Sequence, residues 1–191
     1  MAPRIGVLAM QGAFREHVTA IQELGLEAEP LRDPAGLDSL DAVILPGGES
    51  TTMDKLLRKF GLQRPLRDRI AAGMPVMATC AGLILLAERV EDGLPDQESL
   101  GLLPVTVRRN AYGRQPDSFE ADLDIAGLRE PFHGVFIRAP VVEAVDDAVE
   151  VLAEHTGRPV AIRSGSILGL TFHPELTRDR RLHRLFLDLV P

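Results

Sequence analysis

A stretch near the middle of the chain changes its pattern at the only cysteine. From Val76 to Leu83 it reads VMATCAGL: an apolar run of strand length, then Cys80, then small and apolar residues typical of a compact helix. Small residues on both sides of Cys80 fit a nucleophile elbow, a tight strand-to-helix turn that exposes one side chain. The helix N-terminus that follows favours the thiolate, which is the nucleophilic form. A buried core cysteine is the competing interpretation, and the local pattern leaves both open.

The same alternation of strand and helix runs through the first half of the chain. Strand patterns occur at residues 4–8, 27–31, 41–45 and 75–79, and helix patterns at 13–24, 52–60, 62–72 and 81–88. Strands that alternate with helices form a parallel sheet covered on both faces. We therefore predict an α/β fold of the flavodoxin-like type, with three layers and a mostly parallel central sheet.

The second half of the chain is richer in strands. The candidates are residues 102–108, 118–123, 134–140, 149–154, 160–162 and 167–172. A final amphipathic helix is predicted at 179–189, and the polar residues 91–99 read as a surface loop. Since no linker or repeat interrupts the pattern, we predict one domain that spans residues 1–191.

The composition excludes several classes of protein. A single cysteine cannot form an intramolecular disulfide, which excludes a disulfide-built scaffold and favours a reducing, cytoplasmic location. No apolar run approaches the about 20 residues of a membrane span. The formal net charge of −7 argues against nucleic acid as a partner. The chain has 191 residues, enough to build a core without a disulfide or a metal.

His173 is the histidine best placed to act as a base for Cys80. It stands in FHPE at residues 172–175, where Pro174 favours extended backbone at the residue before it. Because residues i and i+2 of an extended segment project on the same face, Glu175 can orient the imidazole. A solvated histidine in a surface turn is the competing interpretation. Three further histidines are predicted to be structural or exposed: His17, His155 and His183.

The turn after the third predicted strand is a candidate oxyanion hole. Gly47 and Gly48 supply flexible backbone at a strand end, where N–H groups can point into a cleft. The N–H of Ala81, directly after the cysteine, is the second natural donor. An ordinary tight turn is the competing interpretation of the two glycines. No phosphate loop, HExxH, paired CxxC or EF-hand pattern occurs, so we predict no metal and no cofactor.

Together these residues resemble class I, triad-type glutamine amidotransferases, which share a PGG turn, a cysteine elbow and a late HPE. The resemblance extends to the glutaminase subunits of pyridoxal 5′-phosphate synthase. It rests on GVLAMQGAFREH at 6–17, LPGGESTTM at 45–53, TCAGL at 79–83, RNAYGRQ at 109–115, DSFE at 117–120, GVFIRAP at 134–140 and FHPELT at 172–177.

The resemblance implies a role for each of these sites. Cys80 attacks the side-chain amide of L-glutamine, His173 and Glu175 complete the triad, and a γ-glutamyl thioester forms. Gln11 shapes the oxyanion turn or the ammonia exit at the partner interface. The positions that match the family's glutamine-binding residues are Gly48, Glu49, Ser50, Arg109, Ile137 and Arg138. Their chemistry agrees, because zwitterionic glutamine needs a cation for its carboxylate and an acceptor for its ammonium group.

The resemblance also implies a partner. The ammonia is delivered to a synthase subunit, in a large hetero-oligomer, that builds pyridoxal 5′-phosphate from ribose 5-phosphate and glyceraldehyde 3-phosphate. Family members are poor glutaminases until they dock. A misaligned oxyanion turn in the free subunit accounts for this, and it predicts a flipped peptide near Gly47 and Gly48.

One departure and three competing functions accompany this interpretation. The family usually has glycine where this chain has Ala78, and alanine adopts positive φ only at a cost. The nearest competing function is that of the glutaminase subunit of another amidotransferase, such as imidazole glycerol phosphate synthase. A cysteine hydrolase or redox sensor on the same fold would leave the HPE unexplained. An inactive interaction subunit would leave the complete triad unexplained.

Overall fold

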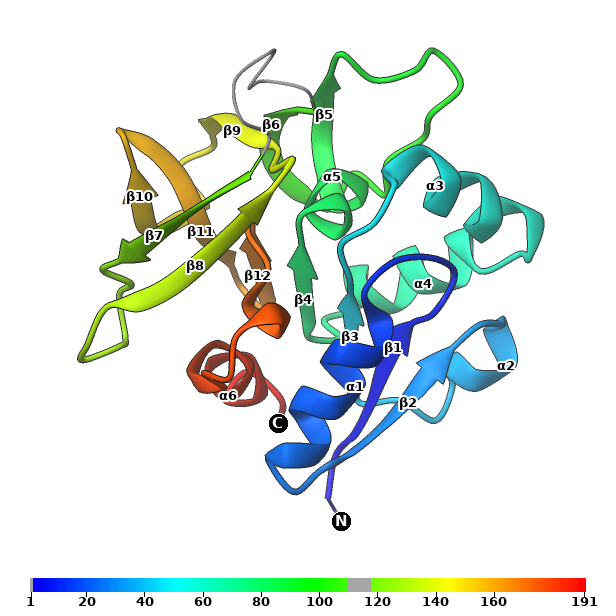
Figure 1. Cartoon of the computed structure of the whole chain (residues 1–191). Helices are drawn as coiled ribbons and strands as arrows, with labels where there is room; N and C mark the ends of the chain where they lie inside the picture. The colour runs from blue at the N-terminus through cyan, green and yellow to red at the C-terminus, as the bar shows by residue number, and fades with distance from the viewer. Residues whose placement is uncertain (1, 110–117) are drawn as a thin grey trace.

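A seven-stranded sheet forms the centre of the molecule, with strand order β10-β11-β12-β4-β3-β1-β2 (Figure 1). This computed structural model describes residues 2–109 and 118–191. The parallel strands are β1 (Arg4–Leu8), β2 (Glu27–Leu31), β3 (Ala42–Leu45), β4 (Val76–Thr79) and β12 (Ile167–Leu170). Two antiparallel strands extend one edge, β11 (Arg158–Ser164) and β10 (Glu150–His155). The predicted mostly parallel sheet is confirmed.

Helices cover both faces of this sheet. On one face α1 (Phe14–Glu23) and α6 (Arg181–Leu187) pack through Ile21 and Phe186. On the other face lie α3 (Ser50–Lys59), α4 (Gln63–Ala71) and α5 (Ala81–Leu86), and the short α2 (Pro34–Leu37) adds Leu37 to the same cluster. Within the part of the chain that the structure describes, no helix combines the length and apolar character needed to cross a membrane.

The central strand β4 shows why its sequence is apolar throughout. Val76 and Ala78 belong to the core cluster under α3, α4 and α5, whereas Met77 belongs to the cluster under α1 and α6. Successive residues of a strand point to opposite faces, and both faces of β4 are covered by helices. All four of its residues are therefore buried, and the end of the strand is rigidly placed.

The strands of the second half that do not join the central sheet form two smaller sheets. The three-stranded sheet has the order β5-β6-β9, formed by β5 (Ala87–Glu91), β6 (Leu103–Arg108) and β9 (Val141–Val145). The antiparallel strands β7 (Ser118–Leu123) and β8 (Phe132–Ile137) form a two-stranded sheet. The 3-10 turn η1 (Pro174–Leu176) follows β12.

Most predicted boundaries differ from the structure by one or two residues, and three of the differences change how a segment is assigned. The helix predicted at 81–88 ends at Leu86, because the chain turns extended at Ala87 and pairs with β6. The strand predicted at 134–140 covers Phe132–Ile137, and a further strand, β9, follows it. Arg138 separates the two with φ 44°, a conformation outside any strand. The loop predicted at 91–99 begins with the last residue of β5.

Candidate active site

Cys80 occupies a strained turn between β4 and α5. Its φ of 48° and ψ of −105° lie where a residue with a side chain is rarely found. The Cys80 N–H donates to Leu170 O at 2.9 Å, and the Cys80 carbonyl accepts from Leu83 N at 3.1 Å. These bonds to β12 and α5 hold the turn in place. The backbone turn of the predicted elbow is therefore present, and Cys80 at its tip is 6% exposed.

Ala78, the departure from the family pattern, lies inside β4 and not in the elbow. It pairs with Gly169 of β12 and with Leu45 of β3. Among the described residues the positive φ near this point belongs to Cys80, and Ala78 has none. The strain that a glycine would relieve is thus absent at residue 78.

His173 and Glu175 lie together after β12. The distance from His173 Nδ1 to Glu175 Oε1 is 2.7 Å, and both residues are buried, at 8% and 4% exposure. The backbone route differs from the prediction of an extended segment. His173 has φ −112° and ψ 86°, and Glu175 lies in η1 because Pro174 starts a 3-10 turn. The turn brings the carboxylate back under the imidazole, and His173 N–H donates to Val135 O at 2.9 Å.

The charges of this pair follow from their surroundings. Burial alone lowers the pKa of His173, but the adjacent Cys80 and Glu175 side chains outweigh it and raise that pKa to about 10. Burial raises the pKa of Glu175, but His17 and His173 hold it below its usual range. An imidazolium beside an ionised carboxylate is therefore the favoured state at neutral pH.

We expect ¹⁵N NMR to show His173 as an imidazolium at pH 7 that loses its proton only as the pH rises toward about 10. The folded-state pKa lies above the ordinary 6.5, so the pairing stabilises the fold fully below that pH. The stabilisation is lost as the pH rises through the folded-state pKa. In a Glu175→Gln variant the proton should be lost at lower pH. A neutral His173 ring at pH 7 would contradict this assignment.

Gly47 and Gly48 are glycines because of close approaches on both sides of the turn. A Cβ on Gly47 would lie 2.4 Å from His173 Cε1, and one on Gly48 would lie 2.3 Å from Gln11 Oε1. A contact below 3.0 Å forces a neighbour to shift, which is costly for the packed His173 ring and easier for the end of the Gln11 side chain. The turn therefore presses its backbone against His173 and Gln11, which places peptide groups beside Cys80.

Residues after β1 clamp this turn from the other side. Ala13 N–H donates to Gly47 O at 3.1 Å, and Glu49 N–H donates to Gln11 Oε1 at 2.7 Å. The trans peptide directs the N–H of Gly48 away from the Gly47 carbonyl, hence away from Ala13. Gln11 is thus placed at the candidate oxyanion turn. Ala81, the other predicted donor, begins α5, so its N–H lacks a partner within the helix.

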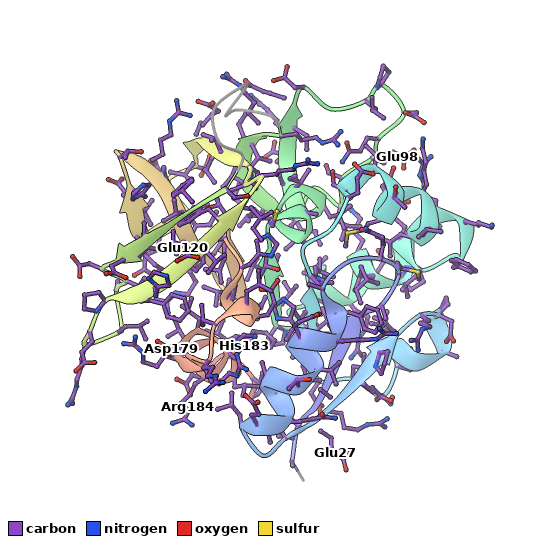
Figure 2. The ribbon with its side chains drawn as sticks, viewed as in Figure 1. Glu27, Glu98, Glu120, Asp179, His183 and Arg184 are labelled. Carbon is purple, nitrogen blue, oxygen red and sulfur yellow. The ribbon has the colours of Figure 1, made fainter. Side chains whose placement is uncertain are left out.

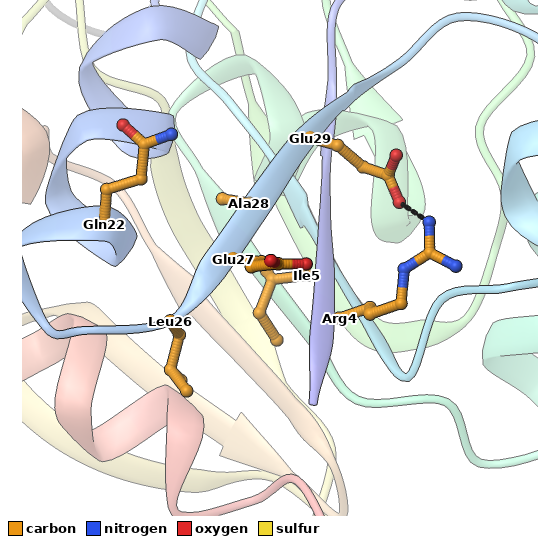
Figure 3. A pocket seen from close by; sticks show the side chains of 7 residues that line it. All are labelled: Arg4, Ile5, Gln22, Leu26, Glu27, Ala28 and Glu29. Carbon is orange, nitrogen blue, oxygen red and sulfur yellow. Dashed lines mark hydrogen bonds and ion pairs between the residues drawn. The ribbon is translucent and has the colours of Figure 1, made fainter. Parts of the chain in front are cut away.

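A cleft of about 340 Å³ opens over Cys80 and His173. It is lined by Ala13, Gly48, Cys80, Ile137, Arg138, His173 and Leu176. A second cavity, also about 340 Å³, lies where β1 and β2 begin (Figure 3). Its walls carry the ion pair between Arg4 and Glu29, at 2.6 Å, and none of the predicted site residues. Of these two cavities, the first combines a nucleophile with a base, at the carboxyl end of the sheet where α/β enzymes bind ligands.

The remaining predicted glutamine-binding residues form a cluster at the start of α3. Arg109 Nη2 lies 2.9 Å from Glu49 Oε1, and Arg109 Nη1 donates to Gln97 Oε1 at 3.0 Å. Gln97 Nε2 in turn donates to Ser50 Oγ at 3.2 Å. Burial raises the pKa of Glu49, but hydrogen bonds from Thr51 and Thr52 lower that pKa to about 2. The Glu49 carboxyl is therefore ionised. Glu49, Ser50 and Arg109 adjoin the cleft without lining it.

Sequence reasoning misses two groups of residues near the site. Gln97 lies in the predicted surface loop, where no spacing links it to Arg109 or Ser50. His17 and His183, predicted to be structural or exposed, are both fully buried; His17 contacts Glu175, and His183 contacts His17. The helical spacing of His17 with Ile21 indicates a buried face, but no sequence signal connects it to a residue so distant in the chain. Residues 110–115 and Asp117, from two resemblance motifs, lie outside the described residues.

Comparisons with known proteins agree with this geometry. Residues 7–190 match the SNO glutamine amidotransferase family. The chain is 57% identical to pyridoxal 5′-phosphate synthase subunit PdxT of Nocardioides sp., covering 99% of this chain and 96% of the relative. The PdxT of Mycobacterium leprae is 52% identical, with 98% and 96% covered.

Solved structures give the same result. A crystal structure of a glutamine amidotransferase superposes with a TM-score of 0.92 at 51% identity, covering 97% of this chain and 98% of that one. A glutamine amidotransferase from Thermotoga maritima has a TM-score of 0.65 at 14% identity, covering 99% and 94%. The second likeness concerns the fold alone.

Proposed function

Because this chain belongs to the SNO glutamine amidotransferase family, we propose that it hydrolyses L-glutamine to L-glutamate and ammonia as the glutaminase subunit of a pyridoxal 5′-phosphate synthase. The observation that carries the proposal is that Cys80, at the elbow, and His173 line the same cleft. In addition, His173 Nδ1 lies 2.7 Å from Glu175 Oε1. The PdxT relatives, at 52% identity and above, support the synthase as the destination of the ammonia.

Cys80 is the proposed nucleophile. Its thiolate attacks the side-chain amide carbon of glutamine, forming a C–S bond and placing negative charge on the amide oxygen. The N–H groups of Gly48 and Ala81 are the proposed donors to that oxygen. The C–N bond then breaks, the imidazolium of His173 gives its proton to the departing nitrogen, and ammonia leaves a γ-glutamyl thioester.

Water completes the cycle. His173, now neutral, takes a proton from a water molecule that attacks the thioester carbon. The C–S bond breaks, the sulfur leaves as thiolate, and glutamate is released with His173 protonated again. Glu175 keeps the imidazole in the required tautomer and stabilises its charged form throughout.

Charge complementarity accounts for recognition of glutamine. The ion pair of Glu49 and Arg109 presents both signs of charge next to Gly48 at the edge of the cleft. The ammonium group of the substrate suits Glu49, and its carboxylate suits Arg109 or Arg138. Ile137 supplies an apolar wall for the methylene groups. We propose these residues, with Ser50, as the glutamine-binding set.

The partner synthase is proposed to switch the site on. Because Gln11, Gly12 and Ala13 touch the oxyanion turn, a partner that docks on this segment can change the alignment of the turn. Ammonia released in the cleft would then pass directly to the synthase, and Gln11 is the proposed residue at that exit. The complex is expected to be a large hetero-oligomer.

We expect glutamate release by the isolated chain to be slow and to rise about tenfold or more when the synthase subunit is added. The measurement is glutamate formed from glutamine with and without synthase, with an equal mass of serum albumin as the control. Equal turnover in all three samples would exclude activation by docking. Activation by an imidazole glycerol phosphate synthase partner alone would instead favour a glutaminase subunit of that enzyme.

Two competing functions fit the site less well. A cysteine hydrolase or redox sensor has no use for the glutamine-binding cluster at Glu49, and an inactive interaction subunit has no use for a strained elbow.

We also propose that the chain acts as one domain in the cytoplasm. Both core clusters pack on the same sheet, and a free Cys80 nucleophile requires reducing surroundings.

A further inference from the structure

Two buried histidines stand behind the candidate active site. His17 lies on α1 and His183 on α6, and both are fully buried (Figure 2 labels His183). His17 Nδ1 lies 3.0 Å from His183 Nε2. On its other side, His17 Nε2 lies 3.3 Å from Thr79 Oγ1 and 3.4 Å from Glu175 Oε2. His17 therefore joins the residue before Cys80 to the carboxylate behind His173.

The second oxygen of Glu175 depends on this contact. Glu175 Oε1 is paired with His173, but Oε2 is buried and has no hydrogen bond of good geometry among the described residues. His17 Nε2 lies 3.4 Å from this oxygen, and the same nitrogen lies 3.3 Å from Thr79 Oγ1. A buried carboxylate oxygen without any donor is costly, so this contact bears directly on the charge of Glu175.

The protonation of the two histidines follows from burial and geometry. Burial lowers the pKa of His17, and burial together with His17 lowers that of His183 to about 2, so both rings are neutral. A neutral ring has one N–H, and in His17 it belongs on Nε2, which faces both the Glu175 carboxylate and the Thr79 hydroxyl. His17 Nδ1 then accepts from His183 Nε2. This leaves His183 Nδ1 as a bare acceptor, in agreement with its lack of a partner among the described residues.

We propose that His17 is a positioning residue of this site: its Nε2–H faces Glu175 Oε2 and keeps the carboxylate ionised and directed at His173. The expected effect of His17 on turnover rests on the proposed function. The expected effect of His17 on the charge of Glu175 does not. The charged and titratable groups around His17 are Glu175, His173, Glu16 on its own helix, Arg180 before α6, and His183.

Two amide substitutions separate this role from simple filling of space. The amide of His17→Gln reaches toward the place of Nε2, so it can still donate to Glu175. The amide of His17→Asn ends near the place of Nδ1, so it keeps contact with His183 but leaves Glu175 Oε2 without a donor. Both variants keep a polar group in the same buried position, and each serves as the matched control for the other.

With synthase present, we expect His17→Asn to lower kcat by about 10- to 100-fold with little change in KM. The acid limb of its kcat profile should move to higher pH, since Glu175 is protonated more easily without the donor. His17→Gln should stay within about threefold of the unchanged protein. Equal losses in both variants with an unmoved acid limb would assign His17 a packing role and overturn the proposal.

A second measurement needs no activity. In protein labelled with ¹³C-glutamate, the carboxyl signal of Glu175 is identified by its loss in Glu175→Gln and followed with pH. We expect the pKa of Glu175 to rise in His17→Asn and to remain low in His17→Gln. An unmoved Glu175 titration in His17→Asn would refute the proposal even if the chain proved to have another activity. If the titration moves while the unchanged protein releases no glutamate, only the proposed function fails.

Discussion

The Cys80→Ala variant is expected to lose glutamine hydrolysis by about 10⁴-fold or more while remaining folded. Without the sulfur no thioester can form, and no other described side chain of the cleft offers a comparable nucleophile. The cost in folding free energy should be only about 1 kcal/mol, because only the Sγ atom is removed and the strained backbone persists. The measurements are glutamate release with saturating synthase and urea unfolding.

His173 is the proposed base, and His133, which also contacts a carboxylate, is its matched control. His173 lies 2.7 Å from Glu175 inside the cleft, whereas His133 lies 2.8 Å from Asp122 on the exposed face of β8. His173→Gln should therefore abolish turnover, and His133→Gln should leave it unchanged. Glutamate release by Cys80→Ala at the rate of the unchanged protein would refute the assignment of the nucleophile.

The Gly12→Ala variant is expected to lose kcat by about 100-fold or more, although residue 12 makes no bond to the substrate in the proposed mechanism. A Cβ at this position would lie 1.8 Å from Gly47 O, so the oxyanion turn must move to accommodate it. The loss corresponds to the misplacement of one oxyanion donor. The positive φ of 92° adds backbone strain.

Gly25→Ala isolates that backbone strain. Gly25 has a similar φ of 82°, but an added Cβ there would meet nothing within 4 Å. It should lower the free energy of unfolding by about 1 kcal/mol and leave kcat unchanged. Both variants are assayed with saturating synthase, and unfolding is followed in urea. Equal kcat values for Gly12→Ala and Gly25→Ala would show that the clash with Gly47 does not control the oxyanion turn.

The parts of the fold that could be predicted from sequence are those with strong local patterns. The strands at 4–8 and 41–45 carry apolar runs, and the helices that follow them carry helical spacing and glycine stops, signals that act over a few residues. Boundaries failed where tertiary pairing overrides local preference. Ala87 continues an apolar helical pattern, yet it pairs with Leu103 of β6 and becomes a strand residue.

The candidate site divides in the same way. Cys80, His173, Glu175 and the glycine turn could be selected from sequence because each stands at a strand end within a recognisable short motif. The resemblance to the glutamine amidotransferase family, confirmed by the match over residues 7–190, joined those motifs into one site. The bridge of Gln97 between Arg109 and Ser50 has no such signal, since it depends on how a polar loop folds over α3.

The one cysteine, its strand-to-helix context and the late HPE determined by sequence alone what kind of chemistry to expect and which residues carry it. Only the tertiary structure decided that His17 faces Glu175, that Gly12 must accommodate the Gly47 carbonyl, and that Arg109 is paired with Glu49. The physical reason is range. Strand and helix patterns arise from neighbours in the chain, whereas these contacts join segments that meet only when helices pack on both faces of the sheet.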